Sequence, residues 1–329
     1  MNKVSFLSEE KHLKDIAAAH FQEVFSGSEV YVKLHFGEPG NEFALTPTDV
    51  KPVVNALKGV GLKPILIDTP VNYESPRGTV EGYEKVVEER GYRDLATCVI
   101  SNNGVEVQTE DYTAEVCKEL VEAENVLVLS HVKGHLGAGF GGAIKNLGMG
   151  GVTRETKAIE HESAQPKVVA ECKQCGTCEE VCPVDAIKIV DGEPQVDEEE
   201  CIGCSICTLE CPHGTLKPEV SYFDDLLGQA TAAIINNFSG NAYYVNYLNN
   251  IAKLCDCAVD PEGEIAEDIG FLFSDKATAI DQASVDLVRE ENQEQVFKKH
   301  NTKDPMLQIK FAAEHLGEEF PVSYKLNSI

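Results

Sequence analysis

Basic residues are scarce in this sequence. Its 329 residues include 28 lysines and arginines against 55 aspartates and glutamates, which gives a formal net charge of −27 at pH 7. A negative field of that size repels phosphate backbones, so the composition argues against a nucleic-acid partner. It favours docking against a basic partner surface, although an acidic surface that is only solvated gives the same composition.

Long apolar runs are also absent. No run reaches the roughly 18 residues that a membrane-spanning helix needs, so no membrane association is expected. The N-terminal segment MNKVSFLSEEKHLKDIAAAHF becomes charged before the apolar core of a signal peptide develops. Together with an apolar content of 43%, these features predict a cytoplasmic globular protein with one large domain or two ordinary ones.

Cysteine, in contrast, is abundant and patterned. Eight of the 12 cysteines lie in two runs, CKQCGTCEEVCP and CIGCSICTLECP, and each run reads C-x2-C-x2-C-x3-C-P. In this pattern three closely spaced thiolates bind one iron–sulfur cluster, and the fourth binds the other cluster. The spacing therefore predicts two 4Fe–4S clusters, one held by Cys172, Cys175, Cys178 and Cys211 and the other by Cys201, Cys204, Cys207 and Cys182.

Zinc is the alternative ligand for these thiolates. Zinc sites usually combine two C-x2-C pairs that lie farther apart, and a doubled run of four thiolates with a trailing proline offers zinc no advantage. Disulfides are disfavoured in the reducing cytoplasm that is expected here. The pattern therefore favours clusters that transfer single electrons, and with them a redox role for the chain.

The cysteine runs define a predicted module over residues 168–218. Between the runs, AIKIVDGEPQVDEEE reads as two short strands joined by a turn at Asp191 and Gly192. This α+β unit is an internal repeat and resembles the bacterial two-cluster ferredoxin. It is inserted between residues 1–167 and 219–329, which we predict to form one discontinuous α/β domain.

The rest of the chain alternates between apolar β-branched runs and amphipathic helical patterns. Such an alternation predicts a mostly parallel sheet that helices cover on both faces, which is an α/β fold carrying the inserted α+β module. The predicted strands cover residues 29–36, 63–68, 96–101, 125–131, 242–248 and 270–274. The predicted helices cover residues 47–61, 81–92, 112–124, 221–238 and 276–290.

Polar residues follow several of the predicted strands. His35, Asp68 and His131 each close a strand, Ser101-Asn102-Asn103 closes another, and His135 follows in the loop after His131. Because ligands of parallel sheets bind outside the carboxyl ends of the strands, we expect the three histidines and Asp68 to approach one crevice. Imidazoles and a carboxylate suit a divalent metal or acid–base catalysis, whereas hydrogen-bonded capping of strand ends is the simpler alternative.

The stretch HVKGHLGAGFGGAIKNLGMGG, which begins at the fourth strand end, is dense in glycine. Gly137, Gly139 and Gly142 satisfy G-x-G-x-x-G, but the run starts too late after its strand for a dinucleotide fingerprint. A P-loop is excluded because Lys145 is followed by Asn146 and not by serine or threonine. We expect the glycine backbone, Lys145 and Asn146 to hold an anionic ligand or substrate in the crevice.

Four cysteines remain outside the module. Cys255 and Cys257 form a C-x-C element that is too tight for a redox disulfide of the C-x-x-C kind, but that can offer a thiolate to a metal. The alternative is that both are inert, one buried and one pointing away. Cys98 and Cys117 lie inside a predicted strand and a predicted helix, where core packing is expected.

Several of these segments together resemble one protein family. HFGEPGN, SHVKGHLGAGFGGAIKNLGMGG, the CDC element and SDKATAIDQAS are similar to motifs of the iron–sulfur-centre proteins in the domain of unknown function 362 family. The resemblance covers nearly the whole chain. It implies a large α/β domain with a two-cluster ferredoxin module and a cytoplasmic redox role in anaerobic or facultative prokaryotes, but it names no substrate.

Two functions are compatible with these features. In the first, an oxidoreductase receives electrons from a ferredoxin or another redox protein, and passes them through the clusters to a substrate or metal near His35, His131 and His135. Lys145 and the glycine backbone would then hold an anionic group, and a histidine would transfer protons. In the second, the protein is a non-enzymatic electron-transfer or scaffold protein whose α/β domain docks a partner redox enzyme.

Overall fold

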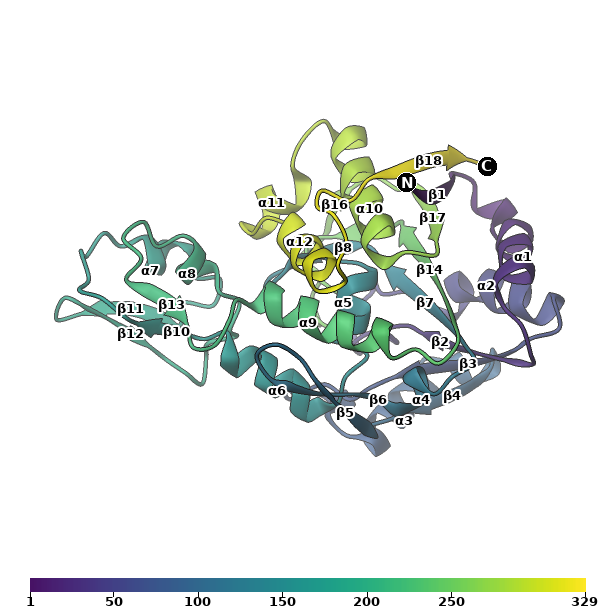
Figure 1. Ribbon diagram of the computed structural model, residues 1–329, viewed down its shortest axis with the longest axis horizontal. Helices are drawn as coiled ribbons and strands as arrows, with labels where there is room; N and C mark the ends of the chain where they lie inside the picture. The colour runs from purple at the N-terminus through teal and green to yellow at the C-terminus, as the bar shows by residue number, and fades with distance from the viewer.

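The computed structural model describes residues 1–329 and is organised around one eight-stranded sheet (Figure 1). The strands follow the order β18-β1-β17-β14-β7-β2-β3-β4. Their bounds are β1 Asn2–Leu7, β2 Glu29–Lys33, β3 Lys63–Asp68, β4 Thr97–Ile100, β7 Asn125–His131, β14 Asn241–Leu248, β17 Gly270–Ser274 and β18 Tyr324–Ser328. The pairs that β17 forms with β1 and β14 are antiparallel and the other pairs are parallel. The expected α/β class with a mostly parallel sheet is therefore confirmed.

The sheet is buried on both faces, as a mostly parallel sheet requires. All 7 residues of β7 are buried. Val126 and Val128 pack into one hydrophobic cluster and Leu127 and Leu129 into the other, because successive side chains of a strand point to opposite faces. Because β7 is buried on both faces of the sheet, residues 125–131 form a continuous apolar run.

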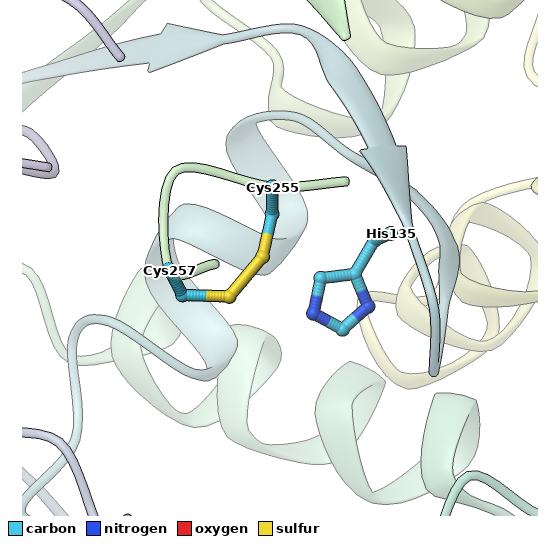
Figure 2. Close-up of side chains that lie close together, drawn as sticks. All are labelled: His135, Cys255 and Cys257. Carbon is cyan, nitrogen blue, oxygen red and sulfur yellow. A yellow bond between two sulfur atoms is a disulfide. The ribbon is translucent and has the colours of Figure 1, made fainter. Parts of the chain in front are cut away.

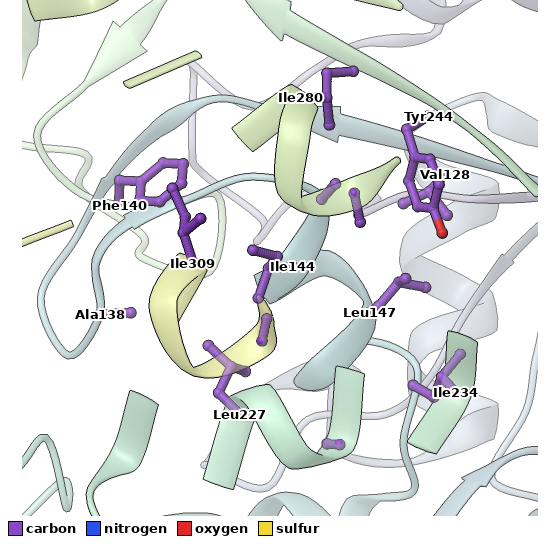
Figure 3. Packing of buried hydrophobic residues seen from close by; sticks show 14 of the residues in the cluster. Val128, Ala138, Phe140, Ile144, Leu147, Leu227, Ile234, Tyr244, Ile280 and Ile309 are labelled. Carbon is purple, nitrogen blue, oxygen red and sulfur yellow. The ribbon is translucent and has the colours of Figure 1, made fainter. Parts of the chain in front are cut away.

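Helices form the layers above and below the sheet. One cluster joins the sheet to α1 (Leu13–Val24), α2 (Pro47–Gly59) and α3 (Val80–Glu89). The other joins it to α5 (Ala143–Gly148), α9 (Phe223–Asn236), α10 (Ala277–Asn292) and α12 (Met306–His315). Figure 3 shows the second cluster, in which side chains of α5, α9, α10 and α12 converge with Phe140 and with Val128 of the sheet. No helix is both long and apolar enough to cross a membrane.

The start of α2 illustrates how local sequence sets an element. The backbone N–H of Thr46 donates to Oδ2 of Asp49 over 2.7 Å, which forms a capping box, and Pro47 occupies the first turn, where its missing N–H removes no helical hydrogen bond. After the helix, Gly61 adopts φ +86° and turns the chain into β3. Val50, Val53, Val54 and Leu57 then face the sheet from the buried side of α2.

The helix predicted over residues 112–124 is wrong in its first half. Residues Thr113–Cys117 form strand β6, which pairs with β5 (Gly104–Gln108), and only Lys118–Val121 form helix α4. The segment TAEVC alternates, with Ala114 and Val116 buried and Thr113 exposed, so the strand period was present in the sequence. The pairing with β5 outweighs the helix propensity of the glutamate- and alanine-rich segment.

Several elements at the ends of the chain were not predicted. β1 and β18 lie side by side and parallel at one edge of the sheet, so the first and last strands of the chain meet there (Figure 1). Helices α1, α6 (Arg154–Ser163), α11 (Val296–Asn301) and α12 were also missed. Of these, α6, α11 and α12 matter for the site, since they lie next to the glycine-rich stretch or the cysteine runs.

The two cysteine runs belong to a small lobe that projects from the α/β body between α6 and α9 (Figure 1). Its elements are β10 (Pro166–Val168), α7 (Thr177–Val181), β11 (Ile187–Val190), β12 (Glu193–Val196), α8 (Ile206–Leu209) and β13 (Leu216–Pro218). The predicted hairpin is present as β11 and β12, with Asp191 at φ +51° and Gly192 at φ +89° in its turn. Cys178, Ile187, Cys207 and Leu216 form the small core of the lobe.

Candidate functional site

A cavity of about 370 Å³ lies at the carboxyl ends of β2, β3 and β7. His35, Asp68, His131 and His135 all line it, since the strands are parallel and their carboxyl ends meet at one edge of the sheet. Ser101, Asn102 and Asn103, which follow β4, do not line it. Tertiary structure thus brings together four of the residues that follow strands.

The glycine-rich stretch forms a hairpin beside this cavity. β8 (Lys133–His135) pairs with β9 (Gly139–Gly141), and α5 follows. A Cβ on Gly134 would lie 2.0 Å from the carbonyl oxygen of Lys253, and Gly139 has φ +77°. These two glycines are therefore required by a close backbone contact and by a left-handed turn.

The start of α5 does not offer its backbone N–H groups to a ligand. The N–H groups of Ala143 and Ile144 each donate over 2.8 Å to the carboxylate of Asp281, which belongs to α10. A Cβ on Gly142 would lie 2.4 Å from Oδ1 of the same carboxylate. At this end, the glycine-rich stretch therefore makes room for the carboxylate of Asp281. This corrects the expectation that the backbone near Gly142 binds an anionic ligand.

Asn146 also has internal partners. Its Nδ2 donates to the carbonyl oxygen of Leu129 over 3.0 Å and lies 3.0 Å from Oγ of Ser130, while its Oδ1 accepts from Nζ of Lys33 over 2.6 Å. Lys33 in turn pairs with Asp68 over 2.9 Å. Asn146 therefore positions Lys33 at the cavity edge.

Two of the four histidines that line the cavity, His35 and His131, are held on both ring nitrogens. Nδ1 of His131 lies 2.9 Å from Oδ1 of Asp256, and Nε2 lies 2.8 Å from the carbonyl oxygen of Asn249, so both ring nitrogens face acceptors. His35 instead faces two donors, the N–H of Gly37 at 3.0 Å and the guanidinium of Arg77 at 2.7 Å. Burial, and then Arg77, hold the pKa of His35 well below its usual value.

His135 keeps one free ring nitrogen. The N–H groups of Gly137 and Ala138 donate to its Nδ1 over 3.1 Å and 3.0 Å. Nδ1 therefore carries a lone pair, and Nε2 carries the proton of the neutral ring. Burial, and then the charge of Lys145, keep the pKa of His135 well below its usual value. Nε2 has no hydrogen-bond partner within the chain.

The C-x-C element lies across the cavity from this ring, and its two sulfurs are joined in a disulfide. The C-x-C spacing was expected to be too tight for a redox disulfide of the C-x-x-C kind, yet the two sulfurs are bonded here. One ring nitrogen of His135 and the sulfurs of Cys255 and Cys257 all lie within 4.8 Å of one another. Figure 2 shows the Nε2 edge of the ring turned toward the two sulfurs.

The backbone around the disulfide is held on several sides. The carboxylate of Asp256 accepts from Nζ of Lys133 over 2.8 Å and lies against His131. Burial raises the pKa of Asp256, but the interactions with His131 and Lys133 outweigh burial and hold this pKa well below its usual range. The carbonyl oxygen of Asp256 accepts from the N–H of Glu38 over 2.8 Å. Asn41 Nδ2 donates to the carbonyl oxygen of Cys255 over 3.3 Å, so the HFGEPGN segment and the CDC element form one unit.

Cations dominate the cavity wall, although the chain as a whole is acidic. Lys33, Lys133, Lys145, Lys157 and Arg77 line it, against the carboxylates of Asp68 and Asp256. Sequence reasoning identified only Lys145 in this set. A signal was present for Lys33 and Lys133, since a lysine inside or beside a buried strand needs a partner or a ligand.

Lys145 differs from the other cations because its ammonium group has no hydrogen-bond or ion-pair partner within the chain. Burial, and then the charge of Lys133, lower the pKa of Lys145 to about 8. Lys157 by contrast donates over 2.5 Å to both the hydroxyl of Thr69 and the carbonyl oxygen of Pro70, and burial lowers its pKa to about 7. Lys145 is thus the cation that is free to bind an anion.

The cavity reaches the cysteine lobe. Ile202, between the first two cysteines of the second run, lines the cavity, and its carbonyl oxygen lies 2.7 Å from Nδ1 of His161 on α6. A Cβ on Gly137 would lie 3.5 Å from Cε1 of His135 and 3.6 Å from Cβ of Cys204. Lys303 donates to the carbonyl oxygens of Gly137 and Cys204 over 2.7 Å and 2.6 Å, which ties the hairpin to the lobe.

The eight lobe cysteines differ in burial. Cys178, Cys204 and Cys207 are buried, Cys175 is exposed, and Cys172, Cys182, Cys201 and Cys211 are intermediate. Burial raises the pKa of Cys207, and the neighbouring thiols of Cys204, Cys201 and Cys182 raise it further. The hydroxyl of Thr177 lowers the pKa of Cys175, and the Cys211 thiol opposes this shift. Cys182 thus lies beside the second run, and Cys211 beside the first.

The two remaining cysteines lie in the core. Cys98 and Cys117 are 7% and 1% exposed, as expected for core residues. Burial raises their pKa values to about 11 and about 12, so both are protonated thiols at neutral pH. Neither lines the cavity.

Several curated proteins match short parts of the chain. An uncharacterized ferredoxin of Methanocaldococcus jannaschii is 51% identical over 47 residues, which cover 14% of this chain and 31% of that protein. An iron–sulfur protein of Rhodospirillum rubrum is 40% identical over 48 residues, covering 14% and 25%. Formate hydrogenlyase subunit 2 of Escherichia coli is 41% identical over 58 residues, covering 18% and 28%. The chain spans about a third or less of the length of these curated relatives.

Two solved structures and one family model match the chain over most of its length. A structural-genomics target from Thermotoga maritima has a TM-score of 0.48 at 10% identity, over 87% of this chain and 59% of that one. The lactate racemase apoprotein of Thermoanaerobacterium thermosaccharolyticum has a TM-score of 0.41 at 12% identity, over 88% and 58%. The model of the domain of unknown function 362 (DUF362) matches residues 30–286. The chain therefore belongs to the DUF362 family.

Proposed function

We propose that this protein is an iron–sulfur oxidoreductase, which takes electrons from a redox partner and delivers them to a small anionic substrate in the cation-lined cavity. The observation that carries the proposal is the contact between that cavity and the cysteine lobe at Ile202 and His161. When bound, two 4Fe–4S clusters supply one-electron transfer. The similarity to ferredoxins and to other iron–sulfur proteins supports the same class of cofactor.

The arrangement of the lobe cysteines fits such clusters better than zinc. We assign Cys172, Cys175, Cys178 and Cys211 to one cluster and Cys182, Cys201, Cys204 and Cys207 to the other. Four thiolates around one zinc at about 2.3 Å would lie within about 4 Å of one another. No three of the lobe cysteines approach one another within 4.8 Å, which leaves room between the thiols for a larger inorganic core.

The burial of the two ligand sets suggests a direction for the electrons. Cys175 is exposed, so the first set faces solvent and is open to a partner. Cys204 and Cys207 are buried, and Cys204 lies against the hairpin that borders the cavity. Electrons from a ferredoxin or another redox protein would enter at the first set and leave toward the cavity at the second.

The cavity supports an anionic substrate. It encloses about 370 Å³, which suits a small molecule. Lys145 provides the free ammonium group. Lys33 pairs with Asp68 and Lys133 pairs with Asp256, so the remaining cations leave the cavity wall with an excess of positive charge. The imidazole of His135 offers a hydrogen bond from Nε2 to the bound group. His35 and His131 are positioning residues, because both ring nitrogens of each already contact other groups of the chain.

The cavity distinguishes this proposal from the alternative, which is a non-enzymatic electron-transfer protein. A protein that only relays electrons needs no enclosed cation-lined space behind its second ligand set. If the cavity is a substrate site, small anions should bind there, and Lys145→Met should weaken binding without changing the cluster content.

The test is metal and ligand analysis of the full chain, purified without oxygen from the cytoplasmic fraction where we expect it. We expect about eight iron and eight sulfide ions per chain, together with an anion affinity that Lys145→Met lowers and that the matched surface variant Lys310→Met leaves unchanged. Protein with zinc in place of iron, or equal anion affinity in both variants, would contradict the proposal.

A further inference from the structure

We propose that Cys255 and Cys257 are a redox-active pair, whose disulfide accepts two electrons from the second cluster site and opens to a thiol and a thiolate in the cavity. This inference rests on the proposed function, because the lobe must carry clusters that deliver the electrons. It adds a two-electron centre between one-electron carriers and the substrate. The C-x-C element then has a chemical role that neither the cysteine lobe nor the anion site explains.

The position of the pair is the first argument. The two sulfurs face the cavity, and a ring nitrogen of His135 lies within 4.8 Å of both (Figure 2). Because the N–H groups of Gly137 and Ala138 both donate to Nδ1, the nitrogen facing the sulfurs is Nε2 with its proton. An N–H at that place stabilises a thiolate by a hydrogen bond. The same proton disfavours a metal at Nε2, since a metal needs the lone pair there.

The second argument is a short connection to the lobe. The position of a Cβ on Gly137 is 3.6 Å from Cβ of Cys204 and 3.5 Å from Cε1 of His135. Lys303 holds this contact, because its ammonium group donates to the carbonyl oxygens of both Gly137 and Cys204. The N–H of Gly137 donates to Nδ1 of His135 over 3.1 Å, so hydrogen bonds connect Cys204 through Lys303 and Gly137 to His135, which lies beside the disulfide.

The third argument is that the loop is held by bonds that do not involve sulfur. Asp256 is bound by His131 and Lys133 through its carboxylate and by Glu38 through its carbonyl oxygen. The hydroxyl of Tyr73 donates to the carbonyl oxygen of Cys257 over 3.2 Å. Cleavage of the S–S bond leaves all of these bonds intact, so the two sulfurs stay close enough to re-form it.

The charges in the cavity favour the reduced product. Lys133 and Lys145 both line the cavity with the two cysteines, and nearby cations stabilise a thiolate over a thiol. Two electrons and one proton convert the disulfide to one thiol and one thiolate. The electrons come from a low-potential one-electron donor, such as a reduced ferredoxin, and arrive singly through the lobe. The proton comes from the Lys145 ammonium group, which solvent water then reprotonates.

The experiment measures the state of the two thiols and the number of electrons consumed. Full-length protein with its clusters is first oxidised with oxidised glutathione and then titrated anaerobically with reduced methyl viologen. Iodoacetamide labelling and mass spectrometry of the peptide that contains Cys255 and Cys257 follow each step. We expect uptake of about four electrons per chain, about two for the clusters and two for the disulfide, and labelling of both cysteines only after reduction.

Three controls isolate the inference. The double variant Cys255→Ser/Cys257→Ser should keep its iron and take up about two electrons. Wild-type protein stripped of iron by a chelator should show little labelling with the same reductant, and Cys117→Ala, which changes a core thiol outside the cavity, should behave as the wild type.

Each of the other possible results contradicts a specific part of the inference or of the proposed function. If the clusters are reduced but Cys255 and Cys257 stay unlabelled, or are never oxidised, the redox pair is refuted and the proposed function stands. If stripped protein is labelled as fast as loaded protein, the disulfide does not take its electrons through the lobe. If the purified chain binds no clusters, the proposed function and this inference both fail.

Discussion

Nδ1 of His161 lies 2.7 Å from the backbone carbonyl oxygen of Ile202, and both residues line the cavity. His161 belongs to α6 of the α/β body, whereas Ile202 lies between the first two cysteines of the second run. The ring of His161 also stacks on Phe223 at a centroid distance of 5.0 Å. Burial lowers the pKa of His161 to about 4, so the neutral ring donates to the carbonyl at physiological pH. The second cysteine run is therefore anchored directly on the cavity wall.

Cys201→Ser should remove one of the two clusters. Cys201 is a member of the proposed second ligand set, and a serine hydroxyl is a poor ligand for iron at neutral pH. We expect about four iron ions per chain in place of about eight, with the first set still loaded. Iron and sulfide analysis together with electron paramagnetic resonance of the reduced protein measures this.

The matched control for that change is Cys98→Ala, which alters a buried thiol in the α/β core. It should keep the full iron content. Equal iron content in Cys201→Ser and wild type would contradict the ligand assignment.

Anion binding should weaken as the pH rises above about 8. Burial lowers the pKa of Lys145 to about 8, so its ammonium group loses charge from that pH upward and not from above 10, as a free lysine does. With sulfate as the probe, we expect the dissociation constant to rise by up to about tenfold per pH unit above 8. Calorimetric titration between pH 6.5 and 9.5 measures the profile.

Lys145→Arg provides the comparison, because a guanidinium keeps its charge throughout this range. Its sulfate affinity should stay nearly level above pH 8, which also separates Lys145 from Lys157, whose pKa burial lowers to about 7. If the wild type and Lys145→Arg show the same pH profile, Lys145 is not the titrating cation.

Asp281→Ala should destabilise the α/β body. The carboxylate accepts the N–H groups of Ala143 and Ile144 at the start of α5 and an Nδ2–H of Asn246 over 2.9 Å, and all three donors are buried. Removing the acceptor leaves them unsatisfied and removes the cap of α5, at a cost of about 2 to 4 kcal/mol in the free energy of unfolding. Anaerobic urea unfolding, followed by circular dichroism, gives the shift.

The exposed residue Glu291 on the same helix serves as a control for Asp281. Glu291→Ala should change the unfolding free energy by less than about 0.5 kcal/mol. Asp281→Asn keeps one side-chain oxygen and should fall between the two. An unchanged urea midpoint in Asp281→Ala would show that the capping interaction does not matter for stability.

Lys303→Met should loosen the contact between the lobe and the glycine-rich hairpin. Lys303 is 3% exposed, and besides its bonds to Gly137 and Cys204 it pairs with the buried carboxylate of Asp224 over 2.5 Å. Without the lysine that carboxylate is buried and unpaired, which costs about 3 to 5 kcal/mol. We expect a lower unfolding midpoint and faster amide hydrogen exchange around Cys204.

The double variant Lys303→Met/Asp224→Asn tests the cause. It removes both charges, so it should recover part of the lost stability while the contact to Cys204 stays weakened. Lys310→Met, which changes a partly exposed lysine on α12, should behave as the wild type. Fast exchange around Cys204 that the double variant fully reverses would contradict a direct role for Lys303 in holding the lobe.

Sequence patterns predicted the parts of the fold that depend on local periodicity. The strands at 63–68, 125–131 and 270–274 end where the structure ends them, because continuous apolar runs bounded by turn residues leave little choice of register. The hairpin at β11 and β12 followed from its Asp-Gly turn. The segment at 112–124 failed because its strand pairs with β5 through tertiary contacts that a helical pattern does not reveal.

From the sequence, the cavity could be predicted only as the place where the carboxyl ends of the parallel strands lie together. Asp68 and three of its four histidines, all but His161, were identified because parallel strands bring their carboxyl ends together. The roles of the histidines were not predicted, because these roles depend on which neighbouring group contacts each ring nitrogen. His131 faces two acceptors and His35 two donors, and the partners come from segments as far away as Asp256.

The sequence alone determined the cysteine pattern and, through it, the expected cofactor class, because ligand spacing within a short loop is a local property. It also determined six of the eight strands of the main sheet, and helices α2, α3, α9 and α10. Only the tertiary structure decided that Asp281 occupies the helix end where an external anion was expected, and that Cys255 and Cys257 are joined beside His135. The contacts of Asp281 with the start of α5, and of His135 with the disulfide, join residues more than a hundred positions apart, and no periodicity along the chain encodes such long-range neighbours.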